Sequence, residues 1–172
     1  MNCFSRSLLF IALAVCMYSC KFTKAHEARL FNDSLIRINQ TARANVQVWA
    51  DSFELCKVSG NYTTLTGPRE LMENYLRQEI TEVEQMEPLG IGGEDFKKGE
   101  LTLLKIQLMQ VEKGFSRYEK LTKESGTDDM NAIADGIDDL IKEEETAISN
   151  LLLIQKKYAA DNGFPLGEKK LI

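Results

Sequence analysis

Few side chains of this 172-residue chain are of the types that carry metal or redox chemistry. There is one histidine, His26, beside four cysteines. A di-iron centre of the ferritin kind needs Glu-x-x-His on two helices, and attached haem of the c type needs Cys-x-x-Cys-His. A single histidine cannot supply the first arrangement, and the second motif is absent from the sequence. We therefore expect no metal site and no bound cofactor.

Nucleophilic catalysis has equally little support. The sequence contains no Gly-x-Ser-x-Gly, and His26 precedes the helical pattern and offers no base for Cys56. Cys56 falls on an apolar helical stripe with Trp49 and Phe53, which predicts a buried, inert thiol. The glycine-rich residues 90–93 lack the Gly-Lys-Ser/Thr of a phosphate-binding loop, so we expect them only to turn the chain. These residues predict a protein that is not an enzyme.

One acidic run, residues 143–145, lies on a long amphipathic segment near the C-terminal end. Such a run can bind a cation weakly, but a solvated helix face is its more common role. Glu144 falls where the helical pattern calls for an apolar residue. Facing the core, it would need a partner such as Lys105 or Arg77; otherwise its carboxylate lies at the edge of the helix contact, in water.

The N-terminal stretch has the features of an export signal. Arg6 is followed by an apolar block, residues 8–18, and then by Ser19 and Cys20. A transmembrane helix needs about 20 apolar residues, so this block is too short to span a bilayer comfortably and is typical of a signal peptide. We expect residues 1–19 to be removed on export.

Met17-Tyr18-Ser19-Cys20 resembles the lipobox of bacterial lipoproteins, in the relaxed form found in Bacteroidota. Met17 and Tyr18 stand where the usual pattern has an aliphatic and a small residue. The resemblance implies that Cys20 is acylated and becomes the new N-terminus. It also implies attachment to the bacterial cell membrane, with the outer membrane and its periplasmic or surface face as the expected place. Residues 20–26 would then form a lipidated tether.

Two shorter resemblances concern the part that follows. Asp33-Ser34-Leu35 resembles the three-residue O-glycosylation motif of exported Bacteroidota proteins, which makes Ser34 a candidate for glycosylation. Residues 155–164 resemble the closing segment of several small uncharacterised helical lipoproteins.

Charge and cysteine content limit the partners. Arg6 is the only charged residue before Cys20, so the processed chain keeps 20 basic and 26 acidic side chains, a formal charge of −6. An acidic surface argues against nucleic acid and against electrostatic binding to anionic lipid, which leaves acyl chains as the contact with the membrane. Cys56 would be the remaining free thiol. If Cys20 were not lipidated, a disulfide between Cys20 and Cys56 would become available.

Apolar residues spaced by threes and fours predict four helices. The stripes cover residues 31–56, 72–83, 101–122 and 130–158, and breakers stand at 59–61, 87–93, 125–126 and 162–163. Gly114 indicates a close helix crossing within the third stripe, and Thr127 is the expected N-cap of the fourth helix. The link at 125–126 is short, so the third and fourth helices should be antiparallel.

These patterns predict an all-α chain, with an up-down-up-down four-helix bundle over residues 27–163 and a C-terminal tail over 164–172. Two function classes remain. The favoured hypothesis is a non-enzymatic lipoprotein that acts through an unidentified protein or envelope partner. The alternative is a bundle that binds a small apolar molecule in a cavity lined by five aromatic residues: Trp49, Phe53, Tyr75, Phe115 and Tyr118.

Overall fold

The computed structural model describes the backbone of residues 3–167 and the side chains of residues 24–167. Every regular element within that part of the chain is a helix, so the protein is all-α as the sequence predicts. The elements are α1 (Cys3–Ser59), the 3₁₀ turn η1 (Tyr62–Leu65), α2 (Thr66–Gln85), α3 (Gly93–Gln110), the π-turn η2 (Val111–Phe115), α4 (Ser116–Tyr118), α5 (Thr127–Asp135) and α6 (Asp138–Asp161).

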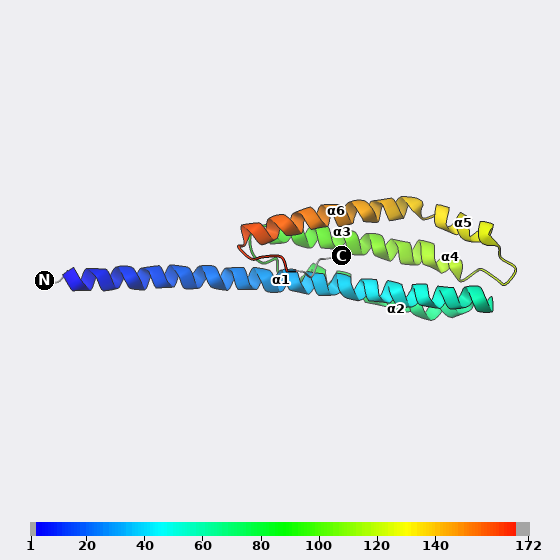
Figure 1. The fold of residues 1–172 in the computed structure, drawn as a ribbon, viewed down its shortest axis with the longest axis horizontal. Coiled ribbons are helices and arrows are strands. Elements are labelled where there is room, and N and C mark those ends of the chain that lie inside the picture. Colours follow the sequence, from blue (N-terminus) through cyan, green and yellow to red (C-terminus); the bar gives the residue numbers. More distant parts are fainter. Residues whose placement is uncertain (1–2, 168–172) are drawn as a thin grey trace.

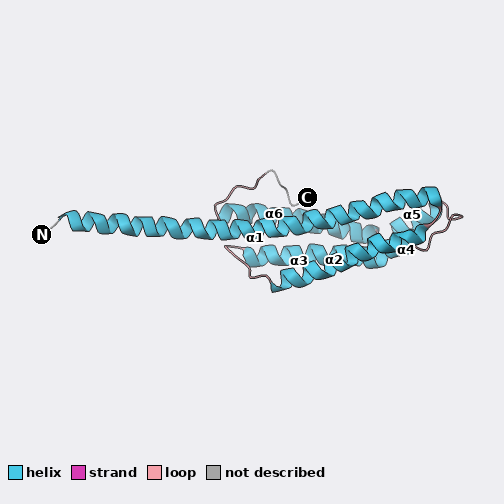
Figure 2. Ribbon diagram, turned by 90° about the horizontal axis from the view of Figure 1, so that it is seen from below, coloured by secondary structure: helices cyan, strands magenta, loops and turns pink. Residues whose placement is uncertain are grey.

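The long helices lie side by side, and the N-terminal end of α1 extends beyond the others (Figures 1 and 2). The most extensive packing joins α3 to α6, then α2 to α3 and α1 to α2, while α1 and α6 touch at few points. Helix α1 begins at Cys3, well before residue 27, so the backbone of the expected tether is continuous with it. No helix of the described residues combines the length and hydropathy that a bilayer span requires.

The predicted stripe of α1 is the face that it buries. Its buried members are Phe31, Leu35, Ile38, Ala42, Trp49 and Cys56. Val46 is the exception, because 44% of it is exposed, and Phe53 is half-buried. Helix α1 ends as predicted: Gly60 adopts a left-handed φ of 73°, and its N–H donates to the Cys56 carbonyl at 2.7 Å.

The connection from α1 to α2 is more structured than a loop. Tyr62 and Leu65, in η1, are 3% and 0% exposed, so this turn closes one end of the core. Pro68 stands in the first turn of α2, where its missing N–H breaks no helical hydrogen bond. Helix α2 then buries Met72, Leu76 and Val83 and ends at Gln85, close to the predicted end.

The third predicted helix is α3, η2 and α4 in succession. It begins at Gly93, eight residues before the stripe that starts at Leu101, and its fully buried side chains include Leu103 and Leu104. The helix widens into a π-turn at Val111, and the helical segment ends at Tyr118. The expected link at 125–126 is therefore wrong in length, because residues 119–126 connect α4 to α5.

The fourth predicted helix is two helices. Gly136 and Ile137 interrupt it, with Ile137 at φ −120° and ψ 1°, outside helical geometry. The break lets Ile137 turn inward, where it is 6% exposed, whereas α5 buries none of its own residues. The N-cap of α5 is Gly126 rather than Thr127, and the Gly126 N–H donates to Asp129 Oδ2 at 2.9 Å.

The C-terminal end of α6 is capped as predicted. Gly163 has φ 71°, its N–H donates to the Ala160 carbonyl at 3.2 Å, and the Phe164 N–H donates to the Ala159 carbonyl at 3.1 Å. This pair of bonds is the Schellman arrangement, and the buried Phe164 supplies its apolar contact.

Candidate functional site

A cavity of about 240 Å³ lies among the long helices, where four of them face one another. Its apolar walls come from all of these helices and from the π-turn: Ala42 and Val46 of α1, Met72, Tyr75 and Leu76 of α2, Val111 and Phe115 of η2, and Ile137 and Ile141 at the start of α6. Asn45, Gln107, Gln110 and Glu144 complete the lining.

Two irregularities of the backbone shape this cavity. The π-turn places Gly114 against Ile137, so close that a Cβ on Gly114 would lie 2.7 Å from Ile137 Cγ2. Gly114 therefore does mark a close crossing, as the sequence predicts. Val111 and Phe115, on either side of Gly114, line the cavity, as does Ile137 from the helix break. A π-turn inside a helix is frequent at functional sites.

Only some of the five aromatic residues predicted to line a cavity do so. Tyr75 and Phe115 line the cavity, but Trp49, Phe53 and Tyr118 do not. The Trp49 ring stacks on Phe115 with centroids 4.3 Å apart and on Phe53 at 5.4 Å, and Tyr118 meets Trp49 edge to face at 5.5 Å. These three rings pack against one another and fill the core beside the cavity.

The polar end of the cavity is built around Glu144. Gln107 Nε2 donates to Glu144 Oε1 and Gln110 Nε2 donates to Oε2, both at 2.9 Å. Gln110 Nε2 also donates to the Leu140 carbonyl at 3.1 Å, which holds this amide between α3 and α6. Glu144 thus faces inward, but its partners are two amides and neither of the expected cations.

Those two cations are paired elsewhere. Lys105 Nζ lies 2.9 Å from Glu84, and Arg77 pairs with Glu73 and Glu112. Among the described residues, none places a cationic nitrogen within 4.0 Å of the Glu144 carboxylate. Within the described residues, the Glu144 carboxylate is therefore held by hydrogen bonds from amides, with no cation beside it.

One acceptor at the polar end has no partner. Gln107 Oε1 is buried and receives no hydrogen bond from the described part of the protein. Rotating the amide would not relieve this, because it would place the oxygen against a carboxylate oxygen of Glu144. An unmet buried acceptor costs about 1–3 kcal/mol, and a hydrogen-bond donor entering the cavity would remove that cost.

Two further carboxyl groups lie in the core outside the cavity. Glu100 is fully buried, and both of its oxygens accept from Asn39 Nδ2 at 2.9 Å. Burial raises the pKa of Glu100 to about 8 against the opposing effect of the Asn39 hydrogen bond. Burial also raises the pKa of Glu79, which is 8% exposed. The sequence analysis missed both residues.

A signal for Glu100 was present. Phe96, Glu100 and Leu104 are spaced by four, so Glu100 lies on the apolar stripe of α3. A carboxyl group at such a position is either paired or protonated, and here the fold supplies one amide and no cation.

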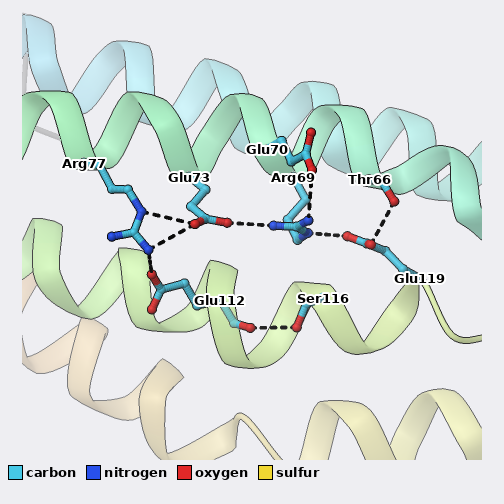
Figure 3. A network of polar contacts seen from close by, with 8 residues as sticks. All are labelled: Thr66, Arg69, Glu70, Glu73, Arg77, Glu112, Ser116 and Glu119. Carbon is cyan, nitrogen blue, oxygen red and sulfur yellow. Dashed lines mark hydrogen bonds and ion pairs between the residues drawn. The ribbon is translucent and has the colours of Figure 1, made fainter.

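An ion-pair network joins α2 to the segment around η2 and α4 (Figure 3). Arg69 binds Glu119 and, at 2.7 Å, Glu73, and Arg77 bridges Glu73 at 3.1 Å to Glu112. Its members alternate in sign along the contact, so each cation has an anionic partner. The network connects α2 to this segment and is not part of the cavity.

The other residues singled out in the sequence are dispersed. The side chain of Cys20 lies outside the described residues. Ser34 is partly exposed, and its Oγ donates to the Leu30 carbonyl at 3.0 Å. Cys56 is 1% exposed with Sγ 3.2 Å from Thr64 Oγ1, as expected of a buried thiol. His26 is exposed on α1, and the described residues include no group of three metal-ligating side chains.

Comparison with known proteins gave no relationship: no family model, no curated protein and no solved structure matches this chain.

Proposed function

We propose that the chain is a non-enzymatic lipoprotein of the bacterial cell envelope, anchored by acyl chains on Cys20. Its folded part acts as an up-down-up-down four-helix bundle that contacts a protein or another envelope component. The observation that carries the proposal is the sequence of an apolar export signal that ends at Ser19-Cys20.

The distance from Cys20 to the folded core agrees with this arrangement. Ala28, which is fully buried, follows Cys20 by eight residues. Eight helical residues span about 12 Å, so acyl chains on Cys20 would hold the bundle close to the bilayer surface.

The opposite end of α1 presents apolar side chains to solvent. Leu55 and Val58, three residues apart and so on one helix face, are 71% and 89% exposed. Their position at the end remote from Cys20 favours contacts that reach away from the membrane.

The test is intact-mass analysis and membrane fractionation of the native protein beside Cys20→Ala and Cys16→Ala variants. We expect the mass of residues 20–172 plus acyl chains, loss of the Cys20→Ala protein from the membrane, and no change for Cys16→Ala. An unlipidated soluble product would contradict the proposal. The Cys20–Cys56 disulfide considered from the sequence does not fit the fold, because both cysteines lie on α1 and are separated by 36 residues, about 54 Å of helix.

The cavity favours a second candidate function, the binding of a small molecule. From the sequence, this function was expected to depend on five aromatic residues and an apolar ligand. The cavity that carries it has two of those residues and a polar end, which changes the chemistry of the molecule it fits.

A further inference from the structure

We propose that the cavity binds a small amphipathic amine, with the ammonium group on Glu144 and Gln107 and the apolar body between Tyr75, Phe115 and Ile137. The proposal rests on the second candidate function and does not depend on Cys20. It specifies a ligand class that the sequence did not suggest.

The size of the cavity limits the ligand. An engineered apolar cavity of about 150 Å³ holds one benzene molecule, so 240 Å³ accommodates a body of about ten heavy atoms. A molecule of this size carries one ring and a short chain. Most of the cavity lining is apolar, so the apolar body of the ligand would contact mainly apolar atoms.

The hydrogen-bonding groups on the cavity wall favour a ligand that donates hydrogen bonds. Tyr75 donates its hydroxyl hydrogen to the Ile38 carbonyl at 3.0 Å, and the Gln110 amide donates to Glu144 and to Leu140. These two side chains have no donor left for a ligand, and the donors that remain on the lining are the second N–H of Gln107 and the amide of Asn45. Acceptor sites remain at the polar end, because a carboxylate has about four lone-pair sites and the Glu144 oxygens receive one amide bond each. Gln107 Oε1 is a further acceptor and has no partner.

The negative charge of the site favours a positively charged hydrogen-bond donor over a neutral one. Glu144 has no cationic partner among the described residues, and the adjacent Glu143 and Glu145 add to the negative potential of this part of α6. Charge-assisted hydrogen bonds to a carboxylate are about twice as strong as neutral ones.

The experiment uses the full chain purified in detergent, with empty micelles as the blank, and three probes that share a phenyl ring and a short chain. The probes are 2-phenylethylamine, the uncharged propylbenzene and the anionic 3-phenylpropionate. Binding is measured by NMR titration of backbone amides. We expect the amine to bind at least about tenfold more tightly than propylbenzene, because a buried charge-assisted pair is worth more than about 1.4 kcal/mol, and we expect no binding of the anion.

Two variants locate the site, and one serves as the control. Glu144→Gln should abolish the preference for the amine while propylbenzene binding persists, and Val46→Phe should block both the amine and propylbenzene by filling the cavity. Glu143→Gln removes an exposed neighbouring carboxylate and should change amine affinity by less than about twofold.

Equal affinity for amine and propylbenzene, or an amine preference that survives Glu144→Gln, would overturn the proposal. If Glu144→Gln does not fold, as judged by circular dichroism, the comparison of the three probes on the unmodified protein still decides it. The same titration on Cys20→Ala separates the two functions. Amine binding should persist in this variant, because Cys20 is not part of the cavity, whereas the lipoprotein proposal is tested by whether the variant is lost from the membrane.

Discussion

Gly114 in the π-turn and Ile137 at the break between α5 and α6 are in van der Waals contact, so close that there is no room for a methyl group between them. The added carbon at position 114 would meet the Cγ2 atom of a β-branched residue, which cannot rotate away easily. This contact joins the two irregular segments that line one side of the cavity.

Gly114→Ala should therefore destabilise the protein, although alanine is the better helix former. Overpacking costs about 1–3 kcal/mol and exceeds the gain in helix propensity of about 1 kcal/mol. Chemical denaturation measures the change in the free energy of unfolding. Gly67→Ala is the control, because Gly67 in α2 has no neighbour within 4 Å of the added carbon, and it should be neutral or stabilising.

Ile137→Ala removes the side-chain atoms that the added carbon at position 114 would meet, and it is therefore combined with Gly114→Ala in a double variant. The double variant should lose less stability than the sum of the two single losses. Additive losses would show that the contact at position 114 is not the cause.

The buried Glu100 should make stability depend on pH. Its pKa is about 8 in the folded protein and ordinarily 4.5, so folding binds a proton between these values. The stabilisation is complete below pH 4.5 and is lost as the pH rises through 8. The free energy of unfolding should fall between pH 5 and 8 by an amount on the order of 3 kcal/mol, and Glu79 contributes with the same sign.

Glu100→Gln should remove most of this dependence, since an amide is neutral throughout the range. At pH 8 the variant should be more stable than the unmodified protein, and at pH 5 nearly equal to it. Glu87→Gln, at an exposed position, is the control and should keep the slope. A slope unchanged by Glu100→Gln would contradict the assignment of the pH dependence to this carboxyl group.

The ion-pair network should show unequal contributions from its two arginines. The Arg69 side chain is 14% exposed and its partner Glu119 18%, whereas Arg77 is 54% exposed. Arg69→Met leaves a half-buried carboxylate unpaired and should cost about 2–3 kcal/mol. Arg77→Met should cost less than about 1 kcal/mol, because solvent screens exposed pairs. Similar losses in urea denaturation would argue that burial does not set the strength of these pairs.

Alanine substitutions at Gly90 and Gly163 separate the cost of a steric clash from the cost of backbone strain. Both have left-handed φ, 74° and 71°, so alanine at either position should cost about 1 kcal/mol for the backbone alone. At Gly90 the added carbon would also lie 2.4 Å from the side-chain oxygen of Asn162, which accepts from the Ile91 N–H; nothing lies within 4 Å at Gly163. Gly90→Ala should therefore lower the thermal midpoint by more than Gly163→Ala, and equal shifts would contradict this account.

The sequence alone was sufficient for the burial and the end of α1 and for the cap of α6, but not for the N-cap of α5 or the break between α5 and α6. Period and breakers predicted the buried stripe of α1, its end at Gly60 and the cap of α6 at Gly163, because helix formation and capping depend on residues within a few positions of each other. The burial of Cys56 followed from the same period.

The tertiary structure alone decided which groups meet across the helices. The period places Glu144 and Glu100 on inward faces, but only packing determined that amides, rather than Lys105 or Arg77, would reach Glu144 and that Asn39 would reach Glu100. The helix break at Gly136 and Ile137 likewise brings Ile137 onto Gly114, a contact between residues distant in sequence. Partner choice, the π-turn and the cavity depend on the offset between helices, and a periodic pattern carries no information about that offset.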